Sequence, residues 1–102
     1  TLQGYEVSLA ESGRDAIAKL NADFFDMLIM DLKMPGTKGA EILREMRRNK
    51  NGAAVIILTG AVDAEDSKDL KELGYDVRDI LYKPVDLFEL LEAVKRKLLH
   101  KV

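Results

Sequence analysis

Short apolar runs alternate with longer amphipathic stretches along the chain. Four of these runs predict strands, at 6–10, 27–30, 55–58 and 77–82. The last three are continuously apolar or nearly so, which is typical of strands that are buried on both faces. Alternation of this kind predicts βα units that build a parallel sheet. Right-handed crossovers would then place helices on both faces of that sheet.

Each stretch between the runs carries signals for an amphipathic helix. Three pairs have the spacing of a cap with its box residue, and they are Ser12 with Asp15, Asp63 with Asp66, and Asp86 with Glu89. Gly74 can end the third helix in a left-handed conformation. The predicted buried positions of the helices are Ala16, Ile17, Leu20, Ile42, Leu43, Met46, Leu87, Leu90, Leu91, Val94 and Leu98. The aromatic residues expected in or near the core are Tyr5, Phe24, Phe25 and Phe88.

Composition narrows the class of protein. A chain of 102 residues forms one domain, here 1–102, because it is too short for two cores. The chain has no cysteine, which excludes disulfides and thiolate metal sites and fits a cytoplasmic protein. A net charge of -2 gives no electrostatic footprint for direct contact with nucleic acid. No apolar run is long enough to span a membrane.

Three polar residues stand where three of the expected strands end. Asp31, Thr59 and Lys83 follow their apolar runs directly, and the carboxyl ends of parallel strands meet at one edge of a sheet. A carboxylate can attack phosphorus and form an acyl phosphate, while a cation and a hydroxyl can stabilise the transferred group. Each residue alone is more often a helix cap, a strand end or a solvated side chain. The three together favour a phosphoryl-transfer site, with Gly60 leaving the approach open and Pro84 fixing the turn after Lys83.

Three motifs in order give the chain a family resemblance. They are Asp31-Leu32-Lys33-Met34-Pro35 followed by Gly39, then Thr59-Gly60, then Lys83-Pro84. With these motifs the sequence resembles the receiver domain of two-component response regulators. The resemblance implies an α/β fold, a flavodoxin-like parallel sheet with helices on both faces and the strand order 2-1-3-4-5. It also implies a cytoplasmic signalling module rather than an enzyme.

The resemblance implies a role for each site residue. Asp31 would accept a phosphoryl group from a phosphohistidine on a sensor histidine kinase or a phosphotransfer domain, and Lys83 would pair with the phosphoryl oxygens. Thr59 would swing inward and reshape a face that binds an output domain or a protein target. The second switch position is Ile80, where the family usually has an aromatic residue, and Tyr82 lies beside Lys83 instead. A homodimer is a further expected assembly.

The implied cofactor is Mg²⁺, which would be held by Asp31, by the backbone carbonyl of Lys33 and by an acid pair at the end of the family's first strand. That strand and the helix after it would precede Thr1, so we expect weak or absent Mg²⁺ binding and slow phosphorylation of these residues alone. The lane between 6–10 and 27–30 would also be empty. Either an upstream segment fills it, the two strands close up, or a second chain covers the edge.

Other functions remain open on the sequence. One is a receiver-like interaction module that is not phosphorylated, or a truncated fragment of a receiver. A phosphatase with an aspartyl nucleophile would want a second Asp where Lys33 stands, and a nucleotide-binding enzyme would want a Gly-rich phosphate loop. A basic cluster on the second helix is expected to be a solvated face rather than a phosphate site, and it comprises Arg44, Arg47, Arg48 and Lys50.

Overall fold

The computed structural model describes residues 4–33 and 38–99, which form a three-stranded parallel sheet with helices on both faces. The strands of this part of the chain are β1 (Met27–Asp31), β2 (Ala54–Thr59) and β3 (Ile80–Tyr82). The helices are α1 (Gly13–Ala22), α2 (Gly39–Arg48), α3 (Ala64–Glu72) and α4 (Leu87–Leu99), with a 3-10 turn η1 (Val77–Asp79) before β3. Met34 and Pro35 of the first motif lie outside the described residues.

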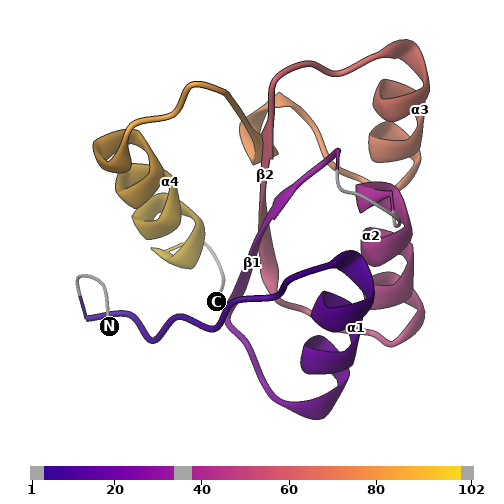
Figure 1. The fold of residues 1–102 in the computed structure, drawn as a ribbon. Coiled ribbons are helices and arrows are strands. Elements are labelled where there is room, and N and C mark those ends of the chain that lie inside the picture. Colours follow the sequence, from indigo (N-terminus) through magenta and orange to yellow (C-terminus); the bar gives the residue numbers. More distant parts are fainter. Residues whose placement is uncertain (1–3, 34–37, 100–102) are drawn as a thin grey trace.

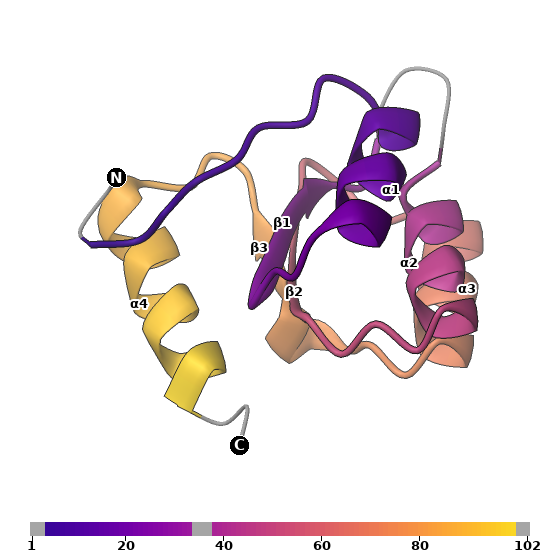
Figure 2. The same cartoon turned by 90° about the horizontal axis from the view of Figure 1, so that it is seen from below.

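The sheet has the order β1-β2-β3, and both neighbouring pairs are parallel. Figure 1 shows α4 on one side of the sheet and α1, α2 and α3 on the other, and Figure 2 shows the same layers from below. Successive β2 side chains point to opposite faces, so Val55 and Ile57 pack toward α1, α2 and α3, while Ile56 packs toward α4. The predicted parallel sheet with helices on both faces is therefore confirmed.

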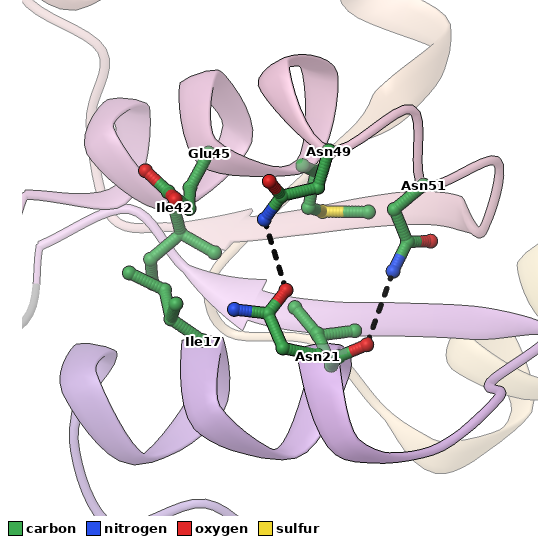
Figure 3. A pocket seen from close by; sticks show the side chains of 8 residues that line it. Ile17, Asn21, Ile42, Glu45, Asn49 and Asn51 are labelled. Carbon is green, nitrogen blue, oxygen red and sulfur yellow. Dashed lines mark hydrogen bonds between the residues drawn. The ribbon is translucent and has the colours of Figure 1, made fainter.

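The core consists of one cluster on each face of the sheet. The larger cluster lies under α1, α2 and α3, and its buried members are Ala16, Leu20, Met30, Leu32, Ile42, Leu43, Met46, Val55, Ile57 and Leu70. The smaller cluster joins Ile56 to Ala93 and Val94 of α4. At the C-terminal ends of α1 and α2, the Asn49 side-chain amide donates to the Asn21 side-chain oxygen at 2.9 Å and so links the two helices (Figure 3).

The predicted strand at 6–10 is wrong. Only Tyr5 makes an isolated β-bridge, and the residues that follow are exposed, with Val7 at 61% and Leu9 at 78%. Figure 2 shows this segment crossing from the side of α4 to the start of α1. A strand needs a neighbour to satisfy its N–H and C=O groups, and no strand of the described residues lies beside this segment. The segment 6–10 therefore does not close up on β1 and pair with it.

The predicted strand at 77–82 is half right. Ile80–Tyr82 forms β3, but Val77–Asp79 forms the turn η1. The Asp76 carboxylate accepts from the Arg78 N–H at 2.9 Å, and the Asp79 carboxylate accepts from the Asp76 N–H at 2.9 Å. This reciprocal capping gives the backbone local partners in place of a sheet ladder, which shortens the strand.

The expected caps mostly form. The Asp63–Asp66 box is complete, Gly74 adopts φ +90, and the Asp86 carboxylate accepts from the Glu89 N–H at 2.7 Å. At α1 the Ser12 hydroxyl accepts from the Asp15 N–H, but the Asp15 carboxylate accepts from Glu11 rather than from Ser12. The box predicted at α1 is therefore only half correct, because Asp15 satisfies the N–H one residue earlier.

Six apolar or aromatic side chains predicted to be buried are exposed instead. They are Phe24, Ile29, Val77, Tyr82, Leu87 and Phe88. Phe24 lies in the short connection between α1 and β1. Because α4 packs on the sheet through Ala93 and Val94, its first turn stays in contact with water. Within the described residues, no helix combines the length and the apolar character that a membrane span requires.

Candidate functional site

Strand register places the predicted site residues at one edge of the sheet. Asp31 is the last residue of β1 and Thr59 the last of β2, while Lys83 directly follows β3. Asp31 pairs with Leu58, and Thr59 pairs with Tyr82. The Lys83 N–H donates to the Thr59 carbonyl at 2.8 Å, which continues the ladder past the end of β3. The strand ends thus bring Asp31 and Lys83 to the two sides of Thr59.

Each oxygen of the Asp31 carboxylate accepts a hydrogen bond. The Lys83 ammonium donates to Oδ2, and the Lys33 N–H donates to Oδ1 at 3.0 Å. The hydrogen bond from Lys83 is the main cause that lowers the pKa of Asp31, burial opposes it, and the Lys33 N–H lowers the pKa further. Asp31 is therefore ionised at neutral pH. Because its side chain remains 34% exposed, the carboxylate is accessible to a reacting group.

Lys83→Met is expected to raise the pKa of Asp31, because the substitution removes the dominant hydrogen bond and the positive charge. A carboxyl group with a lowered pKa stabilises the fold above its unfolded-state pKa, and the contribution is lost as pH falls through the folded-state pKa. The variant should therefore lose less stability than the parent chain on acidification. A carboxyl ¹³C NMR titration of Asp31 measures the shift directly. The matched control is Lys95→Met on the exposed side of α4, and an equal shift in both variants would contradict the assignment.

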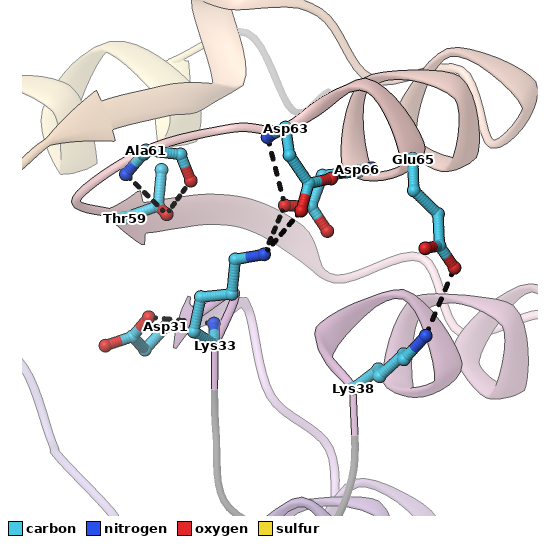
Figure 4. Close-up of polar contacts among 8 residues, drawn as sticks. All are labelled: Asp31, Lys33, Lys38, Thr59, Ala61, Asp63, Glu65 and Asp66. Carbon is cyan, nitrogen blue, oxygen red and sulfur yellow. Dashed lines mark hydrogen bonds and ion pairs between the residues drawn. The ribbon is translucent and has the colours of Figure 1, made fainter.

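The Thr59 side chain is fully buried and turned toward its own loop. Its hydroxyl donates to the Ala61 carbonyl at 2.8 Å and accepts from the Ala61 N–H at 3.3 Å (Figure 4). In this structure the hydroxyl therefore bonds to Ala61 and not to Asp31. Thr59 would have to exchange these bonds before it could reach a group attached to Asp31.

The second predicted switch residue, Ile80, is the first residue of the edge strand β3 and lies away from the strand ends that carry Asp31 and Thr59. Ile80 pairs with Ile57 in the ladder and packs, partly buried, against the larger core cluster. Tyr82 is the exposed side chain of β3, at 52%, and it pairs with Thr59. The exposed aromatic side chain of β3 is thus at Tyr82, two residues nearer to Lys83 than position 80, where the family usually has its aromatic residue.

The residues around Asp31 do not by themselves form a magnesium site. Among residues 4–33 and 38–99 no three His, Cys, Asp or Glu side chains come together as metal ligands. Both Asp31 oxygens already accept hydrogen bonds, and Mg²⁺ requires near-octahedral oxygen coordination. Asp31 and the Lys33 carbonyl would supply two ligands at most, which is too few to complete the coordination that Mg²⁺ requires.

Two lysines connect the segment after Asp31 to α3, a link that sequence analysis missed. The Lys33 ammonium lies 3.1 Å from Asp63 and 2.7 Å from Asp66, and Lys38 lies 3.1 Å from Glu65 (Figure 4). Opposite charges about thirty positions apart give no periodic signal. The link could have been found only by combining the register of β1 and β2 with the cap assigned at Asp63.

The basic cluster of α2 lies on a solvated face, and two of its arginines also contact α3. Arg44 pairs with Asp69 at 2.9 Å, and the Arg47 guanidinium donates to the Glu72 carbonyl at 3.1 Å. Arg47 is exposed and the Arg44 side chain is 42% exposed, as expected of a solvated face, and α3, which packs alongside α2, supplies the acceptors for both. Arg48 pairs with Glu45 on its own helix.

The chain is similar to proteins of one family. Residues 1–95 match the model of the response regulator receiver domain. The chain is 32% identical over 95 residues to the response regulator ArlR of Staphylococcus aureus, which covers 93% of this chain and 42% of ArlR. The chain thus spans less than half the length of that relative.

Solved structures agree with the family match. A CheY-like receiver domain protein from Methanospirillum hungatei superposes with a TM-score of 0.87 at 32% identity, covering 97% of this chain and 78% of the other. The chemotaxis response regulator CheY4 of Vibrio cholerae superposes at 0.79 with 32% identity, covering 91% and 78%. The expected flavodoxin-like α/β fold is thereby confirmed.

Proposed function

Because the chain belongs to the response regulator receiver domain family of two-component signalling, we propose that it is a phosphoacceptor module in which Asp31 takes the phosphoryl group. The observation that carries the proposal is the contact between Asp31 and Lys83, two residues 52 positions apart that meet at the ends of parallel strands. Signalling, rather than metabolic catalysis, is the role of this family.

The transfer uses the groups at the strand ends. An Asp31 carboxylate oxygen attacks the phosphorus of a phosphohistidine, the N–P bond breaks, and the electron pair leaves with the imidazole, which takes up a proton. The product is an acyl phosphate on Asp31. Lys83 already lies against Asp31, so its ammonium can pair with the charge on the phosphoryl oxygens without a large movement. Thr59 then supplies a hydroxyl once it leaves Ala61.

The proposed partners follow from the family. A sensor histidine kinase or a phosphotransfer domain would donate the phosphoryl group, and an output domain or a protein target would bind the face altered by Thr59 and Ile80. Receiver domains generally bind Mg²⁺ for phosphorylation. In this chain Asp31 and the Lys33 carbonyl are the candidate ligands, and further oxygen ligands are required to complete the coordination.

Intact mass spectrometry after incubation with acetyl phosphate and Mg²⁺ tests the proposal. We expect a single phosphoryl increment that forms slowly, because Asp31 and the Lys33 carbonyl alone coordinate Mg²⁺ incompletely, and we expect its loss in Asp31→Asn. The matched control is Asp23→Asn at the end of α1, which should keep the increment. An increment that survives in Asp31→Asn would assign the phosphoryl group to another residue. No increment on the parent chain would favour the alternative, a receiver-like interaction module that works without phosphorylation.

A further inference from the structure

Helix α3 has little apolar contact with the rest of the molecule. Leu70 is its one buried residue, whereas the neighbouring α2 buries five. The element that packs beside α3 is α2, and Figure 2 shows the two helices side by side on the same face of the sheet. A helix held by so small an apolar area depends on its polar contacts for its position.

Those polar contacts run along the full length of α3. The donors all come from the segment after β1 or from α2, and the acceptors all lie on α3 or its cap. The four links are Lys33 with Asp63 and Asp66, Lys38 with Glu65, Arg44 with Asp69, and Arg47 with the Glu72 carbonyl. We call this set of contacts the α3 latch. In every link the basic group belongs to the segment after β1 or to α2, and the acceptor on α3 or its cap is a carboxylate or the Glu72 carbonyl.

Lys33 is the member of the α3 latch that also contacts Asp31. Its backbone N–H donates to Asp31 at 3.0 Å, while its ammonium lies between the two carboxylates of the α3 capping box. Asp66 is the more shielded of these carboxylates, at 19% exposed. Lys33 therefore touches Asp31 with its main chain and the start of α3 with its side chain.

We propose that Lys33 is a positioning residue that holds the first turn of α3 at a place set by Asp31. The chain runs from Thr59 at the end of β2 through Ala61 to the start of α3. The α3 latch therefore also fixes the path of the chain that leaves β2. If the function proposed above holds, a phosphoryl group on Asp31 adds negative charge near the Lys33 ammonium and competes with Asp63 and Asp66 for it. The α3 latch itself exists in the unphosphorylated chain and is testable there.

Amide hydrogen exchange of the unphosphorylated chain tests the proposal. In Lys33→Met we expect the amides of the first turns of α3 to exchange about two- to fivefold faster at low salt, in line with the modest worth of exposed ion pairs. High salt should remove most of the difference, because it screens exposed charges. Lys33→Arg should restore the slow exchange, whereas amides of α1 should stay unchanged in every variant.

A matched variant separates the latch from a general effect of charge. Lys68→Met removes an exposed lysine of α3 itself and should leave α3 exchange unchanged. Equal exchange in Lys33→Met and the parent chain, or an equal increase in Lys68→Met, would overturn the proposal. Because no phosphoryl group is present, this result is independent of whether Asp31 proves to be a phosphoacceptor.

Discussion

Ile42→Ala is expected to lower the free energy of unfolding by about 3–4 kcal/mol, within the range of about 2–5 kcal/mol for large-to-small core substitutions. Ile42 is 0% exposed on the inner face of α2 and belongs to the larger core cluster. Alanine would remove buried methyl groups and leave a cavity that the close-packed neighbours fill only partly. Urea denaturation followed by far-ultraviolet circular dichroism measures the difference.

Ile29→Ala is the matched control for this prediction. Ile29 is the same residue type on β1, but its side chain is 41% exposed. Since water already reaches the side chain, its removal should cost about 1 kcal/mol or less. Equal losses in the two variants would contradict the assignment of Ile42 to a tightly packed core.

Gly39→Ala is expected to destabilise the fold by about 1–3 kcal/mol, the usual cost of overpacking, although alanine favours helices over glycine. A Cβ at Gly39 would lie 2.8 Å from the end of Met30, 3.0 Å from the Leu32 carbonyl oxygen and 3.1 Å from the Leu32 Cα. The Met30 side chain can move, but the Leu32 backbone is fixed by the Gly39 N–H, which donates to it at 3.2 Å. The start of α2 must therefore shift.

The control for Gly39→Ala is Gly52→Ala, because a Cβ at Gly52 meets nothing within 4 Å. This variant should change stability by less than about 0.5 kcal/mol, as is usual for open surface sites. Both variants can be compared by urea denaturation, and by the NMR signals of Asp31, which directly precedes Leu32. If Gly39→Ala were as stable as Gly52→Ala, the close approach of α2 to β1 would be disproved.

Sequence reasoning found the elements whose signals are local and missed those that depend on neighbours. The Asp63–Asp66 box and the Gly74 end of α3 were predictable, because caps depend on side chains a few residues apart. The segment 6–10 looked like a strand, but a strand forms only where another strand lies beside it. The turn η1 was missed because the capping of Asp76 competes with the apolar run that follows.

The candidate site shows the same division. The strand-end rule predicted that Asp31 and Lys83 would converge, and they are in contact in the structure. The orientation of the Thr59 hydroxyl could not be predicted, since it depends on the path of the loop through Ala61. The link from Lys33 to α3 depends on how two loops lie next to each other, which follows from the register of β1 and β2 and not from a periodic pattern along the chain. The chemical roles of these residues remain predictions.

The contact between Asp31 and Lys83 has a consequence for the synthesis of the chain. Ribosomes add residues in order, so Asp31, Thr59 and the α2 and α3 helices all emerge before Lys83. Until then Asp31 lacks the counter-ion that the contact provides. The site is therefore completed only once Lys83 has emerged and β3 has paired with β2. A nascent chain halted before Lys83 would carry the acceptor carboxylate without the cation beside it, and we expect it to be inert toward phosphoryl donors.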